Sequence, residues 1–114
     1  MAVLMVQAIA RTGLEPAFGA AGAGGDAFPN TGREFLVVKN AHATLSRTVT
    51  ITSQIPAGAV PQGAAKTDLA VQVPALEERW IGPLDPASFN DANGRAVVTY
   101  STEADLSVGA FKLA

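Results

Sequence analysis

Short alternating segments separated by dense turn residues constrain this chain more than any other feature of its sequence. The segment RTVTITSQI, residues 47–55, places Val49, Ile51 and Ile55 on one side and threonines on the other. This two-residue period is typical of a β-strand with one solvated face. Turn residues then follow one another in DPASFNDANGR, residues 85–95, as Asp-Pro, Asn-Asp and Asn-Gly. The pattern predicts an all-β fold without a substantial helix.

The remaining apolar segments extend this prediction along the whole chain. A short buried strand is expected near the N-terminus, where a helix is the rival interpretation, and residues 34–40 are expected to form a hairpin with 47–55. Two short strands with a corner at Pro74 and a last hairpin over residues 96–113 complete the set. We therefore predict one domain over residues 1–114, an antiparallel β-sandwich or barrel of jelly-roll-like form. The predicted core consists of Phe35, Leu36, Val38, Val49, Ile51, Val71, Ile81, Val98 and Val108.

Glycine and alanine dominate residues 11–32, between the first two predicted strands. Gly19, Gly22, Gly24 and Gly25 lie close together there, and such glycines prevent a regular element from persisting. We predict an extended loop or arm over 11–32, whose residues 14–27 lie against a neighbouring subunit or a larger surface and are mobile in the free protein. A second Pro/Gly/Ala segment, residues 56–68, is expected to connect two strands.

The amino-acid composition limits the classes of partner that this chain is expected to bind. The 114 residues carry a net charge of −2, and only 16% of them are charged, so part of the surface is expected to be covered by partners. No basic cluster indicates nucleic acid or a membrane surface. Cysteine is absent, which excludes disulfides and thiolate chemistry.

Residue types that perform chemistry are sparse. His42 is the single histidine, and no serine lies in a nucleophile motif. The glycine cluster lacks the Lys-Ser/Thr pair of a phosphate loop, and DANG at 91–94 lacks the later carboxylate of a calcium loop. We therefore expect a protein that is not an enzyme and needs no cofactor or metal. Trp80 and Tyr100 are interpreted as packing or subunit-contact aromatics, with carbohydrate stacking as the alternative.

Three segments carry a resemblance to a known group of proteins. They are FPNTGREFLVVKN at 28–40, IGPLDPASFND at 81–91 and VTYS at 98–101. Together they resemble small structural proteins of tailed bacteriophages, in particular head-decoration, or cement, proteins. The resemblance covers most of the chain from Phe28 onward, together with RTGLEPAF at 11–18.

The resemblance implies a virion protein on the capsid surface, made in the host cytoplasm, with the major capsid protein as partner. It also implies a homo-oligomer, for which a trimer is the expected form. The candidate residues for subunit or capsid contact are Leu14, Phe18, Phe28 and Trp80. Two alternatives remain open: a neck, tail or head-completion protein of the same particle, and a carbohydrate-binding or adhesin module.

Overall fold

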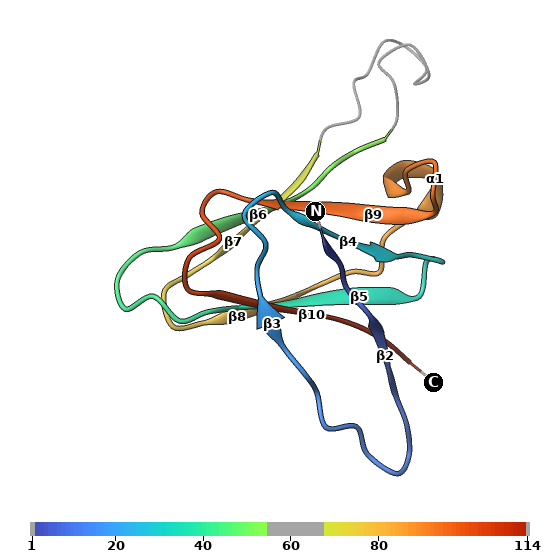
Figure 1. Ribbon diagram of the computed structural model, residues 1–114, viewed down its shortest axis with the longest axis horizontal. Helices are drawn as coiled ribbons and strands as arrows, with labels where there is room; N and C mark the ends of the chain where they lie inside the picture. The colour runs from blue at the N-terminus through green and yellow to red at the C-terminus, as the bar shows by residue number, and fades with distance from the viewer. Residues whose placement is uncertain (1, 55–67, 114) are drawn as a thin grey trace.

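Two β-sheets pack face to face to form the molecule (Figure 1). The structure is a computed structural model that describes residues 2–54 and 68–113. Ile55 and most of the predicted 56–68 connection therefore lie outside the described residues. The first sheet contains, in spatial order, β1 (Ala2–Val3), β4 (Asp26–Pro29), β9 (Arg95–Tyr100), β6 (Arg47–Ile51) and β7 (Leu69–Val73). The second contains β2 (Val6–Ile9), β10 (Leu106–Leu113), β5 (Glu34–Asn40) and β8 (Glu78–Ile81), and β3 (Gly19–Ala20) also pairs with β10.

The core fills the space between the sheets, and the strand alternation predicts most of it. Because successive side chains of a strand point to opposite faces, Leu36 and Val38 of β5 point inward. They are fully buried, as are Val49 and Ile51 of β6. Ile81, Val98 and Val108 are buried as predicted, Val71 packs against the core, and Phe35 does not belong to it because it lies on the opposite face of β5.

The sheets are mixed rather than purely antiparallel. β1 pairs with β4 and β2 pairs with β10 in the parallel direction, whereas the other pairings are antiparallel. The predicted strand at the N-terminus is broken at Leu4 and Met5, where the chain passes from one sheet to the other. It is also far more exposed than expected, because both pieces are sheet edges.

Neither predicted hairpin forms. β5 and β6 belong to different sheets, as do β9 and β10, so the connections at 41–46 and 101–105 cross the sandwich instead of reversing within one sheet. The alternation of buried and exposed side chains is the same in a hairpin and in two strands of different sheets, because each strand buries one face in both cases.

The predicted arm over 11–32 is only partly a loop, because it contains β3 and β4. Two features of Gly25, immediately before β4, require a glycine. Its φ is +92°, and a Cβ there would lie 2.5 Å from the Val98 carbonyl oxygen. Gly25 therefore allows the close approach of β4 to β9. Residues 10–18 form the part that projects from the sandwich (Figure 1).

The turn-rich segment at 81–91 contains the only helix in the described part of the chain, α1 (Pro86–Phe89). Asp85 caps it by accepting a hydrogen bond from the Ala87 amide at 3.1 Å, and proline at the first helical position needs no hydrogen bond from its nitrogen. No helix in residues 2–54 and 68–113 is long and apolar enough to cross a membrane.

Candidate functional site

An aromatic groove lies on the outer face of the β2-β10-β5-β8 sheet. The alternation that buries Leu36 and Val38 turns Phe35, Val37 and Lys39 outward. The register places Phe111 of β10 beside Phe35, Trp80 of β8 beside Val37, and Glu78 beside Lys39. The outward residues of three strands therefore form one continuous surface.

The aromatic rings on this surface contact one another. The ring centroids of Phe35 and Trp80 are 5.5 Å apart with planes only 12° from parallel, and those of Phe35 and Phe111 are 5.9 Å apart. Phe18 adds a tilted ring 5.6 Å from Phe111. Such contacts stabilise the arrangement beyond the apolar area that they bury.

The projecting segment 10–18 forms the opposite wall of the groove. The Gln7 side chain holds it, because its Nε2 donates to the Ala17 carbonyl and its Oε1 accepts from the Ala17 amide, both at 2.8 Å. Gly109 lets the segment approach β10: a Cβ there would lie 2.9 Å from the Phe111 ring and 3.1 Å from the Ala17 oxygen. A side chain at 109 would therefore disturb both the wall and the floor of the groove.

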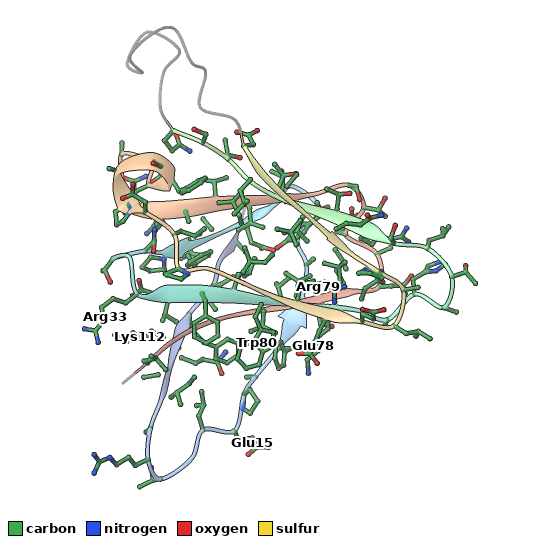
Figure 2. All side chains as sticks on the ribbon, turned by 180° about the vertical axis from the view of Figure 1, so that it is seen from behind. Glu15, Arg33, Glu78, Arg79, Trp80 and Lys112 are labelled. Carbon is green, nitrogen blue, oxygen red and sulfur yellow. The ribbon has the colours of Figure 1, made fainter. Side chains whose placement is uncertain are left out.

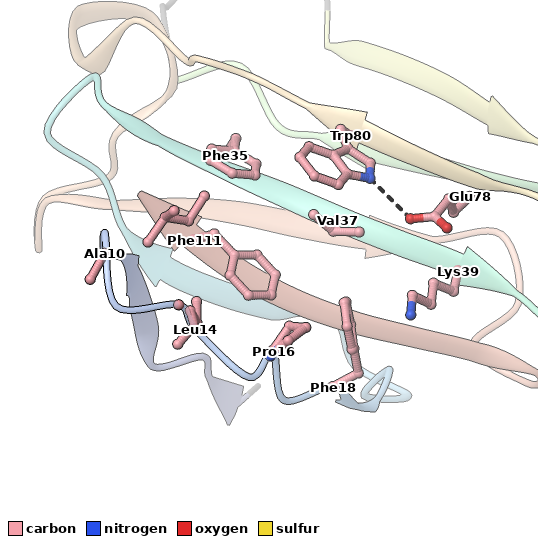
Figure 3. Close-up of a pocket in the computed structure, with 12 residues that line it drawn as sticks. Ala10, Leu14, Pro16, Phe18, Phe35, Val37, Lys39, Glu78, Trp80 and Phe111 are labelled. Carbon is pink, nitrogen blue, oxygen red and sulfur yellow. Dashed lines mark hydrogen bonds between the residues drawn. The ribbon is translucent and has the colours of Figure 1, made fainter. Parts of the chain in front are cut away.

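The groove has a volume of about 350 Å³ and a mainly apolar lining. Figure 3 shows Leu14, Pro16 and Phe18 on the projecting segment, with Phe111 at the base and Phe35 and Trp80 on the far side. A second hollow, lined by Arg33, Gly82, Pro83 and Leu113 among others, continues past Phe35 and Trp80. Trp80 therefore stands between two adjoining depressions.

Trp80 is 66% exposed, which is unusual for so large an apolar side chain. Its indole Nε1 donates to the Glu78 carboxylate at 3.0 Å, which fixes the ring orientation. Lys39 places its ammonium 3.9 Å from the centroid of the Phe18 ring, a cation–π contact. The groove thus has an apolar floor with one acidic and one basic group, Glu78 and Lys39, at its rim. Figure 2 shows Trp80 between Glu78 and Arg79 on one side and Arg33 and Lys112 on the other.

Three of the four predicted contact residues meet in this groove. Leu14, Phe18 and Trp80 line it together although they are far apart in the sequence. Phe28 does not reach it: as a fully buried residue of β4 it belongs to the core, and its assignment as a contact residue is wrong in this fold. Sequence reasoning missed Phe35 and Phe111 as groove residues, although the parity of Phe35 relative to Leu36 and Val38 is a signal that could have found it.

Tyr100 is not part of an exposed site. Its hydroxyl donates to the Asp26 carboxylate at 2.6 Å between β9 and β4. Burial, followed by this hydrogen bond and the nearby negative charge, raises the pKa of Tyr100 well above its usual range. This partly buried tyrosine links β9 to β4 through its hydroxyl and packs against the core.

The segments 28–40 and 81–91 meet in space. Asn30, from the first segment, donates through Nδ2 to the Leu84 carbonyl at 3.1 Å and to Asn90 Oδ1 at 2.8 Å. These hydrogen bonds join the segment 81–91 to the turn before β5. The Asn90 side chain in turn donates to the Asn30 carbonyl, 60 positions away in the sequence.

Glu34 reinforces the same end of the sandwich. Its carboxylate accepts hydrogen bonds from the Thr31 amide at 2.6 Å, the Thr31 hydroxyl at 3.0 Å and the Arg33 amide at 3.3 Å. Burial acts to raise the pKa of Glu34, but these hydrogen bonds outweigh it and the net shift is downward.

Metal-ligating side chains do not cluster in residues 2–54 and 68–113. No group of three or more His, Cys, Asp or Glu side chains in that part of the chain could hold a metal ion. His42 has a structural role, because its Nδ1 accepts hydrogen bonds from the Thr44 and Leu45 amides in the loop after β5.

The fold and the groove define a β-sandwich protein with an exposed aromatic groove on one sheet. No protein-family model, curated protein or solved structure matches the chain.

Proposed function

We propose that this chain is a non-enzymatic structural protein of a tailed-bacteriophage particle, and specifically a head-decoration protein that binds and stabilises the capsid surface. The observation that carries the proposal is the convergence of Leu14, Phe18 and Trp80 in one exposed apolar groove. Exposed aromatic surface of this kind marks sites where another molecule binds. The phage-like pattern from Phe28 onward supports the choice of partner.

In this proposal the major capsid protein supplies an apolar segment that fills the groove. Phe35 and Phe111 form its floor, while Glu78 and Lys39 at the rim select polar groups on either side of that segment. The projecting residues 10–18 contribute one wall, so the Gly/Ala-rich arm takes part in binding through its first half. The protein would be made in the host cytoplasm and reside on the virion.

Binding of the purified chain to capsids that lack it tests the proposal. Co-sedimentation should show saturable binding, and Trp80→Ser should weaken it by about tenfold or more, the effect of removing a central aromatic contact. Leu45→Ser is the matched control, because Leu45 is 53% exposed but lies in the loop after β5, outside the groove. Absence of binding, or equal binding by the Trp80 variant, would refute the assignment.

Two alternatives would give different results. A neck, tail or head-completion protein would bind the particle in the copy number of one ring, which quantitative mass spectrometry of purified virions would reveal. A carbohydrate-binding module is favoured by one observation, the exposed Trp80 beside Glu78 and Lys39, since sugars stack on aromatic rings and bond to polar groups. Binding to a glycan array that Trp80→Ser abolishes, without capsid binding, would establish it.

A further inference from the structure

Two adjoining hollows lie along β5 on the outer face of its sheet, and a third begins where they end. The groove reaches from Lys39 past Val37 to Phe35, and the second hollow continues from Phe35 to Arg33. Arg33 also lines the third hollow, together with Lys112 of β10. An extended segment bound in the groove can therefore follow β5 and reach Arg33 and Lys112.

These two cations are not engaged within the chain. Neither the Arg33 guanidinium nor the Lys112 ammonium forms a salt bridge or a hydrogen bond within residues 2–54 and 68–113. Both side chains are exposed, and Figure 2 shows them together at one end of the sheet. They are therefore free to bind a negatively charged group of another molecule.

Glu34 offsets only part of this charge. It lies opposite Lys112 in the register and lines the third hollow. The side chain is 4% exposed, however, and its carboxylate accepts hydrogen bonds from the amide and hydroxyl of Thr31 and from the Arg33 amide. Two cations and one carboxylate leave this end with one net positive charge.

The opposite end of the groove carries no such surplus. The charges of Glu78 and Lys39 cancel, and each group already contacts an aromatic ring, the first that of Trp80 and the second that of Phe18. The surface along β5 therefore changes from neutral at one end to positive at the other. A partner complementary to it is apolar in the groove and acidic at the Arg33 end.

We propose that the segment of the major capsid protein that fills the groove carries an acidic residue, whose carboxylate binds Arg33 and Lys112 while an apolar side chain lies beside Trp80. This inference rests on the proposed function, because it names the chemistry of the same partner. Arginine and lysine bind carboxylates through charge-assisted hydrogen bonds. Such pairs fix the register and direction of the bound segment.

The register also gives the spacing of the two partner residues. Trp80 lies opposite Val37, which is four residues from Arg33 along the chain. The two contacts are therefore about 13 Å apart, at roughly 3.3 Å per strand residue. An extended partner segment rises by the same amount per residue, so its acidic residue should be about three to five positions from the apolar one.

Capsid binding by a variant without the two cations tests the contact. Arg33→Gln with Lys112→Gln should weaken co-sedimentation by about fivefold or more at low salt, because both carboxylate contacts are lost. The difference should nearly disappear at about 1 M salt, which screens such pairs. Thr99→Glu with Thr102→Glu changes the net charge equally at exposed positions outside the three hollows and should bind like the unmodified chain. Circular dichroism confirms that both variants are folded.

The outcomes separate this inference from the proposed function. If Trp80→Ser weakens capsid binding but the glutamine variant binds like the unmodified chain at low salt, the inference is wrong and the function stands. Equal weakening by the glutamine and glutamate variants would also overturn it, because net charge alone would then explain the effect. If the unmodified chain does not bind capsids, the function is wrong and the inference with it.

Cross-linking tests the chemistry of the partner segment directly. Leu113 is 64% exposed and lines the second and third hollows beside Arg33. Because the chain has no cysteine of its own, Leu113→Cys takes a single benzophenone label there. Irradiation on capsids followed by mass spectrometry should give a peptide of the major capsid protein with Asp or Glu about three to five positions from a large apolar residue. A cross-linked peptide without that pair would overturn the proposal.

Discussion

Asn30 and Asn90 bind each other reciprocally across 60 positions of sequence. Asn30 Nδ2 donates to Asn90 Oδ1 at 2.8 Å, and Asn90 Nδ2 donates to the Asn30 carbonyl at 2.6 Å. Asn30 is 3% exposed, so loss of this bond leaves polar groups without a partner in a region that water reaches poorly. The pair joins the turn before β5 to the corner that follows β8.

Asn90→Ala should therefore lower the free energy of unfolding by about 1–3 kcal/mol, the cost of leaving a buried polar partner unsatisfied. Urea denaturation measures it. Asn93→Ala, in the neighbouring exposed turn, should change stability by less than about 0.5 kcal/mol. If Asn90→Ala kept full stability but lost capsid binding, Asn90 would be a contact residue and the structural explanation would be wrong.

Alanine substitutions of Phe28 and Phe18 should have different effects, the first mainly on stability and the second mainly on capsid binding. Phe28→Ala should cost about 3–5 kcal/mol, because it leaves a cavity in the centre of the core. Phe18→Ala removes a half-buried ring from the groove wall and should cost less stability while weakening capsid binding. Thermal unfolding and co-sedimentation distinguish the two. Equal stability losses would contradict the placement of Phe28 in the core.

Glu34 should make the free energy of unfolding depend on pH in the acidic range. Because its folded-state pKa is lowered from 4.5, the unfolded chain binds more protons than the folded one as the pH falls below that value. The stabilisation is present above pH 4.5 and is lost as the pH falls through the folded-state pKa. Glu34→Gln should be less stable at neutral pH and lose less on acidification. Parallel acid profiles of the two proteins, measured by urea denaturation, would contradict this prediction.

Gln7→Ala should release the groove wall without unfolding the domain. Both hydrogen bonds from this side chain to Ala17 are lost, so amide exchange at residues 14–18 should accelerate. The pair is largely exposed, and global stability should fall by only about 0.5–1.5 kcal/mol. Gln54→Ala, at an exposed position in the loop after β6, serves as control. Unchanged exchange in the segment would show that apolar contacts alone hold it.

The sequence by itself determined the β class and much of the core. Alternation assigned Val49 and Ile51 to a buried face, the predicted core included Leu36 and Val38, and consecutive turn residues indicated the turn-rich segment at 85–95. These features are local: the parity of a strand and the conformational preferences of proline, asparagine and glycine do not depend on which strands pair. Leu14, Phe18 and Trp80, which the sequence analysis names as candidate contact residues, all line the groove.

Only the tertiary structure decided which strands are neighbours. A hairpin and a connection that crosses the sandwich bury the same face of each strand, so the alternation of β5 and β6 could not show that they belong to different sheets. Phe28 likewise lies next to turn residues in the sequence, and its burial depends on the pairing of β4 with β9. The groove depends on contacts between distant segments, because Phe18, Trp80 and Phe111 meet only when β10 and β8 flank β5 and Gln7 holds the projecting segment against them.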